Sequence, residues 1–152
     1  MTDGLRLLVA EDLPDNVELL KLAFSRTGMA APVHYVENGE EAIAYLKGEE
    51  GFGNRAHYPL PTMLLLDLKM PRLDGFGVLK WLRLQPELTR LLVVVFTASE
   101  YQDDIDRAFE LGANCYIVKP VGFDELQDTV RWLENYWRRF GECADRLMAI
   151  AK

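Results

Sequence analysis

The sequence has little cysteine, no excess of positive charge and no long hydrophobic run. Its two cysteines, Cys115 and Cys143, form no CxxC pair. A disulfide framework of the kind that stabilises small secreted domains is therefore not expected. Cys115 lies in an apolar stretch, and we expect it to be a buried small residue.

Membrane and secretion signals are also missing. No apolar stretch approaches the roughly 20 residues that span a bilayer. The first six residues have neither the basic nor the apolar region of a signal peptide. These absences predict a soluble, cytoplasmic protein with no membrane partner.

Acidic residues outnumber basic ones by 24 to 17, and the formal net charge is −7. Surfaces that bind nucleic acid need clustered Lys and Arg to neutralise phosphate. The one local basic cluster, Arg138-Arg139, is too small for that. The charge balance therefore predicts no nucleic-acid partner, and it suits a protein that meets a basic patch or holds a cation.

Short apolar runs alternate with longer amphipathic stretches along the 152 residues. The runs predict strands over 5–10, 32–36, 62–66, 91–96 and 114–118. The amphipathic stretches predict helices over 14–24, 38–46, 75–85, 103–111 and 123–140. Asn38 with Glu41 three residues later is a capping-box pattern at the start of the second helix. The fold class is therefore α/β: a doubly wound, flavodoxin-like (βα)5 domain with a five-stranded parallel sheet of order 2-1-3-4-5.

Short, mostly polar stretches directly follow four of the predicted strands. They are Glu11, Asp12, Asp67, Thr97, Ala98, Ser99, Lys119 and Pro120. The first and third strands are neighbours in this order, so the carboxylates of Glu11, Asp12 and Asp67 should converge. Three carboxylates repel one another unless a cation lies among them, and oxygen ligands favour Mg²⁺ or Mn²⁺. Taken singly, each of these residues could equally be a helix cap or a loop residue.

Asp67 could ligate a metal, accept a proton or attack phosphorus. The surrounding set favours phosphoryl transfer, with Asp67 as the nucleophile, because carboxylates form acyl phosphates. Lys119 would neutralise and Thr97 would hydrogen-bond the phosphoryl oxygens, so that catalysis would consist of positioning and charge stabilisation.

Four stretches, 7–12, 64–75, 93–98 and 112–120, together resemble the receiver domain of response regulators, the phosphoacceptor module of two-component signalling. The resemblance implies a CheY-like fold with Asp67 as phosphoacceptor. It implies Mg²⁺ held by Glu11, Asp12, Asp67 and the backbone carbonyl of Lys69. It also implies that Thr97 and Lys119 contact the phosphoryl group, and that the Lys119–Pro120 peptide bond is cis.

The same resemblance implies a switch. Tyr116 would be the aromatic that moves inward as Thr97 turns to the phosphoryl group, and the small Ala98 would let the adjoining loop close. Lys69 and Ser99, two residues after Asp67 and Thr97, would tune the lifetime of the phosphate. Tyr116 could also be simply a half-exposed strand aromatic.

Details beyond the site resemble the stand-alone regulators that pair with phytochrome-type histidine kinases. They are the Gly-rich 47–61 loop, Leu111-Gly-Ala-Asn, Lys119-Pro-Val-Gly-Phe and the tail with Trp132 and Trp137. The expected partner is therefore a histidine kinase of that type. We expect a receiver domain over 1–140 and a C-terminal helical extension over 141–152, with no output domain.

Trp132 and Tyr136 lie off the apolar stripe of the last predicted helix, four residues apart. Exposed aromatics mark interfaces more often than chance. They predict a homodimer through the region of the fourth helix, fifth strand and fifth helix. Alternatively, Leu147, Met148 and Ile150 could fold back onto them.

Three function classes remain open. The favoured one is a single-domain response regulator that signals by protein contact and is not an enzyme, although it has intrinsic phosphotransfer and dephosphorylation chemistry. The second is an interaction module that works without phosphorylation. The third is a phosphatase with an aspartyl nucleophile, which would normally need an acid two residues after Asp67, where Lys69 stands.

Overall fold

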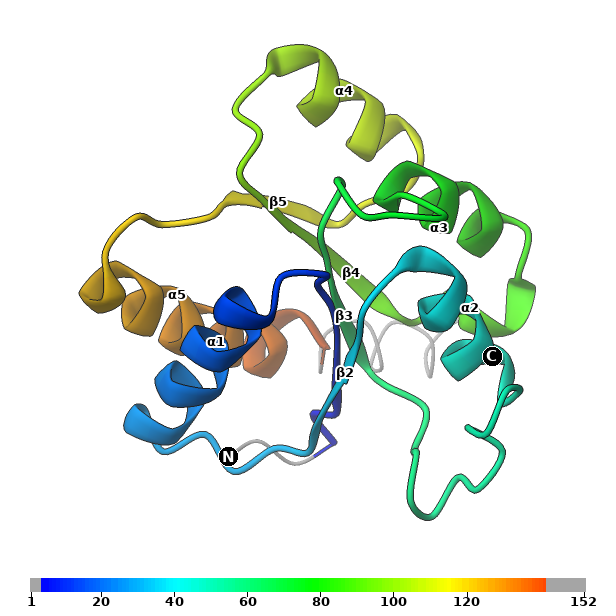
Figure 1. Ribbon diagram of the computed structural model, residues 1–152, viewed down its shortest axis with the longest axis horizontal. Helices are drawn as coiled ribbons and strands as arrows, with labels where there is room; N and C mark the ends of the chain where they lie inside the picture. The colour runs from blue at the N-terminus through cyan, green and yellow to red at the C-terminus, as the bar shows by residue number, and fades with distance from the viewer. Residues whose placement is uncertain (1–3, 142–152) are drawn as a thin grey trace.

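A parallel sheet with helices on both faces forms the computed structural model, which describes residues 4–141 (Figure 1). The strands are β1 (Leu7–Ala10), β2 (Val33–Val36), β3 (Met63–Leu66), β4 (Leu92–Thr97) and β5 (Cys115–Val118). Their order is β2-β1-β3-β4-β5, and every pairing is parallel. The predicted fold class and strand order are confirmed.

Each predicted helix is present, with ends that differ by a few residues. The helices are α1 (Pro14–Arg26), α2 (Gly39–Lys47), α3 (Gly75–Arg83), α4 (Gln102–Glu110) and α5 (Phe123–Tyr136), with a short 3₁₀ helix η1 (Pro86–Leu88). The last predicted helix is divided, because α5 passes into a π-helical turn, η2 (Trp137–Gly141). The expected extension over 142–152 lies outside the described residues.

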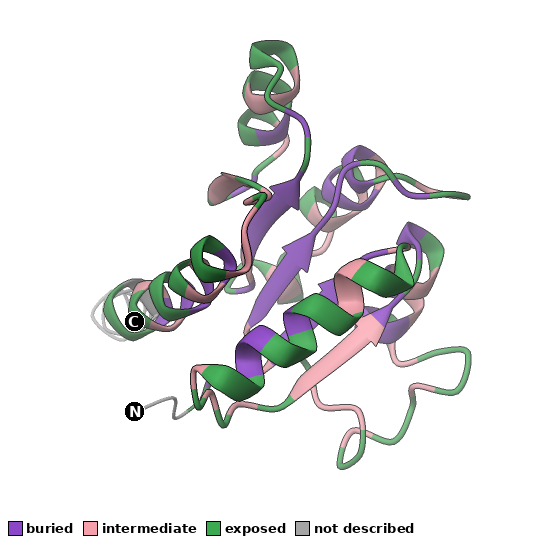
Figure 2. Ribbon diagram, turned by 60° about the vertical axis from the view of Figure 1, so that its left-hand side comes forward, coloured by how far each residue is buried: buried purple, intermediate pink, exposed green. Residues whose placement is uncertain are grey.

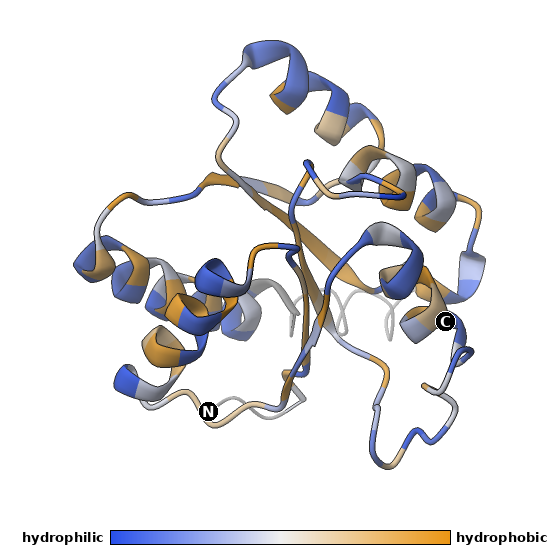
Figure 3. Ribbon diagram, viewed as in Figure 1, coloured by the Kyte–Doolittle hydropathy of each residue, from blue (hydrophilic) through white to orange (hydrophobic). Residues whose placement is uncertain are grey.

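The sheet has two hydrophobic cores because successive strand residues point to opposite faces. One core joins Leu8, Leu64 and Val95 to residues of α2, α3 and α4. The other joins Val9, Leu65, Val94 and others to α1 and α5. Figure 1 shows α1 and α5 on one side of the sheet and α2 and α3 on the other. The strands β1 and β3 are buried throughout. Figure 2 shows the buried strands at the centre of the sheet, and Figure 3 shows that they are hydrophobic.

The start of α2 follows its sequence signal with one difference. The side chain of Asn38 accepts a hydrogen bond from the Glu41 amide at 2.8 Å, which confirms the predicted N-cap. The Glu41 carboxylate accepts from the Glu37 amide at 3.0 Å instead of closing the capping box on Asn38. The Glu37 amide, just before the helix, gains a hydrogen-bond acceptor in this way.

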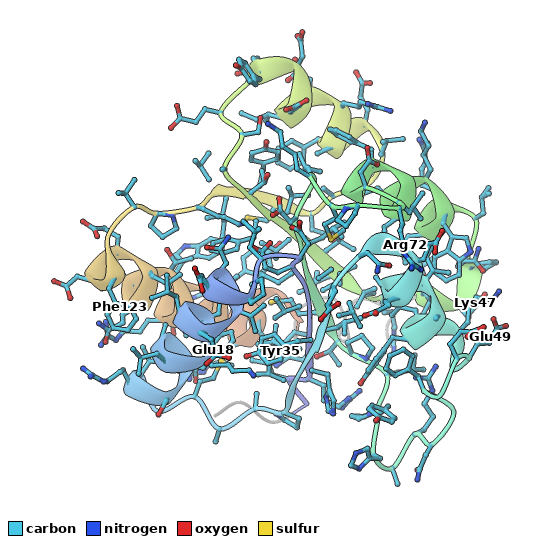
Figure 4. The ribbon with its side chains drawn as sticks, in the orientation of Figure 1. Glu18, Tyr35, Lys47, Glu49, Arg72 and Phe123 are labelled. Carbon is cyan, nitrogen blue, oxygen red and sulfur yellow. The ribbon has the colours of Figure 1, made fainter. Side chains whose placement is uncertain are left out.

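The long connection from α2 to β3 is held by its own side chains. The Arg55 guanidinium donates to the carbonyls of Tyr45, Leu46 and Tyr58 at 2.8–3.2 Å, and so closes the carboxyl end of α2. The rings of Phe52 and Tyr58 meet edge to face at 5.2 Å. Ion pairs flank α2: Lys47 with Glu49 at 3.3 Å, and Glu40 with Arg72 at 3.4 Å; Figure 4 labels Lys47, Glu49 and Arg72.

The prediction that Cys115 is buried was wrong, since its thiol is only partly buried. Cys115 begins β5, which is an edge strand and therefore has a neighbouring strand on one side only. Across residues 4–141, no helix is both long and apolar enough to cross a membrane.

Candidate phosphoacceptor site

The site is built at the carboxyl ends of β1 and β3. Ala10 pairs with Leu66, so the residues that follow these two lie side by side. The Asp67 amide donates to the Ala10 carbonyl at 3.2 Å and extends the contact past the strand ends. Carboxylate oxygens of Glu11, Asp12 and Asp67 all lie within 4.8 Å of one another. The sheet order thus brings together the three carboxylates that the sequence predicts.

Lys119 bridges two of these carboxylates from the end of β5. Its Nζ lies 2.7 Å from Asp67 Oδ2 and 3.0 and 3.1 Å from the two Glu11 oxygens. Its backbone amide donates to the Thr97 carbonyl at 2.7 Å, which fixes the end of β5 against β4. Glu11 and Asp67 are only 3% and 6% exposed. Because buried charges are stable only when paired, Lys119 holds the edge of the sheet together.

The pKa values of the two buried carboxyls, Glu11 and Asp67, are shifted in opposite directions. Burial, with a hydrogen bond to Asp67, raises the pKa of Glu11 to about 7. Burial also acts to raise the pKa of Asp67, but hydrogen bonds from Glu11 and Lys119, with a smaller one from Thr97, outweigh it and leave that pKa below its usual range. Burial acts to lower the pKa of Lys119, but its contacts with Asp67 and Glu11 raise it overall. Asp67 is therefore the ionised member of the pair near neutral pH.

The donor set fits a hard divalent cation. Three carboxylates share one small region with a single ammonium, so negative charge remains in excess when all three are ionised. Carboxylate oxygens are the ligands that Mg²⁺ and Mn²⁺ prefer. Glu11, Asp12 and Asp67 could each supply one ligand oxygen to the same ion.

Asn16 is a member of the site that sequence reasoning missed. Its side-chain amide, in the first turns of α1, donates to Glu11 Oε1. The N-cap of α1 is Leu13, with no side-chain cap, so Glu11 and Asp12 are not helix caps. The only sequence signal for Asn16 is an amide five residues after Glu11, and many helices carry such a residue in their first turns.

Gly75 lets α3 approach the end of β3 closely. Its amide donates to the Leu68 carbonyl at 3.0 Å. A Cβ at this position would overlap the backbone carbonyl of Asp67 and the Cα of Leu68. Absence of a side chain at Gly75 therefore helps to place Asp67.

The remaining predicted residues border the cluster. Thr97 and Ser99 are buried, whereas Ala98 and Lys69 are exposed. The Lys69 amide donates to Asp67 Oδ1 at 3.4 Å, and the Tyr116 hydroxyl donates to the Ser99 carbonyl at 2.9 Å. Tyr116 is a partly exposed aromatic of β5, and its hydroxyl reaches the loop between β4 and α4.

The Lys119–Pro120 peptide bond is trans, so the expectation of a cis bond was wrong. A trans X–Pro bond is favoured by about 0.5–1 kcal/mol. Lys119 already reaches Asp67 and Glu11 with the trans bond in place.

Residues 7–131 match the response regulator receiver domain, and the chain belongs to this family. The probable methanogenesis regulatory protein FilR2 of Methanothrix harundinacea is 36% identical to the chain over 135 residues. That match covers 89% of this chain and 84% of FilR2.

Solved structures of response regulators are similar. RPA3017, from red light signaling of R. palustris, is 34% identical with a TM-score of 0.83, and the match covers 89% of this chain and 94% of that one. The phosphorylated cyanobacterial phytochrome response regulator RcpA is 32% identical with a TM-score of 0.81, covering 90% and 96%. The Mn²⁺-bound form of Rcp1, a Synechocystis response regulator, is 30% identical with a TM-score of 0.76, covering 86% and 92%.

Proposed function

We propose that Asp67 accepts a phosphoryl group from the phosphohistidine of a histidine kinase, and that the chain then signals by protein contact. The observation that carries the proposal is the ion pair of Asp67 with Lys119 beside Glu11 and Asp12, at the sheet edge where three carboxylates meet. Phosphoryl transfer to a carboxylate needs this arrangement, because the nucleophile, Asp67, lies beside a positive charge, the Lys119 ammonium.

The transfer is written as an exchange at phosphorus. An oxygen of Asp67 forms the new P–O bond while the P–N bond to the kinase imidazole breaks. The bonding electron pair stays on that imidazole nitrogen, which takes up a proton. Lys119, 2.7 Å from Asp67 Oδ2, orients the carboxylate before attack and hydrogen-bonds the phosphoryl group afterwards. The buried hydroxyl of Thr97 donates a further hydrogen bond to the same group.

A divalent cation, when bound, would neutralise phosphoryl charge. Glu11, Asp12, Asp67 and the backbone carbonyl of Lys69 would hold it as Mg²⁺, or as Mn²⁺. The Mn²⁺-bound form of the relative Rcp1 supports the choice of a divalent cation. Cation binding requires Glu11 to be ionised. When Glu11 binds the cation, Lys119 would give up its contact with Glu11 and pair with the phosphoryl group instead.

The signal follows from the added charge. The phosphoryl group draws Thr97 towards it, Ala98 lets the loop after β4 close, and Tyr116 fixes that loop through the Ser99 carbonyl. Lys69 and Ser99 tune how long the phosphate lasts. Lys69→Ala therefore changes the dephosphorylation rate, and an unchanged half-life of phospho-Asp67 would rule this role out.

A phytochrome-type histidine kinase is the proposed partner. The support comes from the relatives, since RPA3017 belongs to red light signaling and RcpA is a phytochrome response regulator. Phosphotransfer to this chain from an autophosphorylated phytochrome kinase, compared with unrelated histidine kinases, tests the pairing. Equal transfer from all of them would contradict it.

We also propose a homodimer through α4, β5 and α5. Trp132 is 45% exposed, and its ring stacks on Tyr136 at 5.0 Å. Trp132 also lines a mostly apolar groove of about 390 Å³ along β5, together with Cys115, Tyr116, Ile117, Asp128 and Thr129. The tail residues 147–150, which could instead cover this face, lie outside the described residues.

Sedimentation at increasing concentration tests the dimer. Trp132→Ala should weaken it, and a monomer at high micromolar concentration would refute it.

Incubation with acetyl phosphate and Mg²⁺ separates the three function classes, with Asp67→Asn as the matched control. Stable phosphate on the wild type alone supports the phosphoacceptor. Continuous release of phosphate supports the phosphatase, although Lys69 stands where its acid would be. No reaction in either protein supports the interaction module.

A further inference from the structure

Ser99 is held from three directions. Its hydroxyl donates to Asp104 Oδ2 at 2.5 Å and accepts from the Tyr101 amide at 3.3 Å. Its carbonyl accepts from the Tyr116 hydroxyl at 2.9 Å. Ser99 is 5% exposed, so these bonds are shielded from water. The loop that follows Thr97 is therefore tied to both α4 and β5.

Asp104 supplies the tie from α4, a helix with few other attachments. Within α4, all of which the structure describes, only Ala108 is buried. Contacts of α4 with α3 include two that involve arginine. The Arg107 guanidinium lies over the Phe76 ring at 4.2 Å, and the Glu110 carbonyl accepts a hydrogen bond from Arg83 at 3.1 Å. In Figure 1, α4 lies at the top of the view, next to α3. The bond from Ser99 to Asp104 thus joins a sparsely packed helix to the site.

Asp104 also lines a hollow beside the carboxylate cluster. This hollow, of about 530 Å³, is lined by Asp12, Lys69, Met70, Asp74, Phe76 and Asp104, among others. Asp12 belongs to the carboxylate cluster, and the Lys69 amide bonds to Asp67. Water that attacks a phosphoryl group on Asp67 must come from the solvent side, where this hollow lies. Asp104, near the start of α4, forms part of the wall of this hollow.

We propose that Asp104 is a positioning residue which sets the lifetime of phospho-Asp67 by holding Ser99. The bond keeps the Ser99 hydroxyl turned towards α4, away from any water in the site, and it fixes the position of the loop after β4. Loss of either partner frees the loop, opens the site to water and speeds hydrolysis. This inference rests on the proposed phosphorylation of Asp67.

The test compares four proteins by one rate. Wild type, Asp104→Ala, Ser99→Ala and the double variant are phosphorylated with acetyl phosphate and Mg²⁺ and then desalted. The fraction still phosphorylated is followed by the mass of the intact protein. Each single variant should lose phosphate roughly three- to tenfold faster. This is the rate change expected when one hydrogen bond that holds the loop in place is lost. The double variant should be no faster than the singles, because the two residues act through one bond.

Two more variants separate positioning from charge and from stability. Asp104→Asn keeps an acceptor oxygen, so it should restore most of the wild-type lifetime. Asp103→Ala removes an exposed carboxylate from the neighbouring position of α4 and should leave the lifetime unchanged. Thermal melts confirm that the variants remain folded during the assay.

The outcomes are distinct. If wild type is not phosphorylated, the proposed function fails. If wild type is phosphorylated but the lifetime of Asp104→Ala is unchanged, or the two single effects multiply in the double variant, the role of Asp104 is wrong while the proposed function stands. If Asp103→Ala speeds hydrolysis as much as Asp104→Ala does, general charge on α4 is responsible and the role of Asp104 is again wrong.

Discussion

Lys119 Nζ lies 2.7 Å from Asp67 Oδ2 and 3.0 Å from Glu11 Oε1, so one ammonium from β5 joins the ends of β1 and β3. Breaking a buried pair by removing one partner leaves the other charge without compensation. Lys119→Met should therefore lower the free energy of unfolding of the cation-free protein by about 3 kcal/mol. Urea unfolding in the presence of a chelator measures this loss.

The matched control is Lys21→Met, since Lys21 pairs with Glu18 on the surface at 3.6 Å. Surface substitutions of this kind change stability by about 0.5 kcal/mol or less. Equal effects of the two substitutions would show that Lys119 does not hold the site together.

Glu11 should make stability depend on pH in a defined window. Its pKa is about 7 in the folded protein and 4.5 as the ordinary value. Since the raised pKa favours the protonated folded state, this contribution is fully present below about pH 4.5 and is lost as the pH rises through 7. It amounts to at most about 3 kcal/mol.

Chelator-treated wild type should therefore lose stability relative to Glu11→Gln between about pH 4.5 and pH 7. The lowered pKa of Asp67 acts in a different range, because its contribution is present above the ordinary value of 3.8 and is lost only as the pH falls below it. Urea unfolding of both proteins across the window provides the measurement. Parallel pH profiles would contradict the raised pKa of Glu11.

Mg²⁺ should stabilise the folded protein through Asp12. A ligand that binds only the folded state stabilises it by RT ln(1 + [L]/Kd), about 2.7 kcal/mol at a hundredfold excess over Kd. Asp12→Ala should abolish most of the rise in Tm that Mg²⁺ produces. Asp15→Ala, which removes an exposed carboxylate from the first turn of α1, should keep it. A Tm that rises equally in both variants would place the cation elsewhere.

Gly75→Ala should be costly even though alanine favours helices. The new Cβ would overlap the Asp67 carbonyl and displace backbone at the site, and overpacking of this kind costs roughly 1–3 kcal/mol. Gly77→Ala on the same helix meets only the end of the Leu73 side chain, which can move. Chemical unfolding and the phosphorylation rate of both variants test this; a stable, fully active Gly75→Ala would show that close approach is not required.

The fold could be predicted because the sheet is buried on both faces. Strands such as Met63–Leu66 are then continuous apolar runs, and the alternation with helices leaves one common strand order. The strand order also fixes the positions of residues that directly follow strands. The sequence could therefore predict that Glu11, Asp67 and Lys119 lie together.

Contacts that depend on side-chain geometry could not be read in this way. Asn16 on Glu11 and Asp104 on Ser99 are helical polar residues with no signal of their own in the sequence. Cys115 was misjudged because its apolar neighbours do not reveal that β5 is an edge strand. The trans bond before Pro120 differs from what the family resemblance implied, since a resemblance does not determine each peptide bond.

The central claim is that Asp67 carries the phosphate, and the most direct measurement locates the modified residue. Borohydride reduces an aspartyl phosphate to homoserine, so protein treated with acetyl phosphate and Mg²⁺ is reduced, digested and sequenced by mass spectrometry. Homoserine is expected at position 67 only, and none in protein that received no acetyl phosphate. Homoserine at position 12 in place of 67, or no modified residue in protein that binds Mg²⁺, would contradict it.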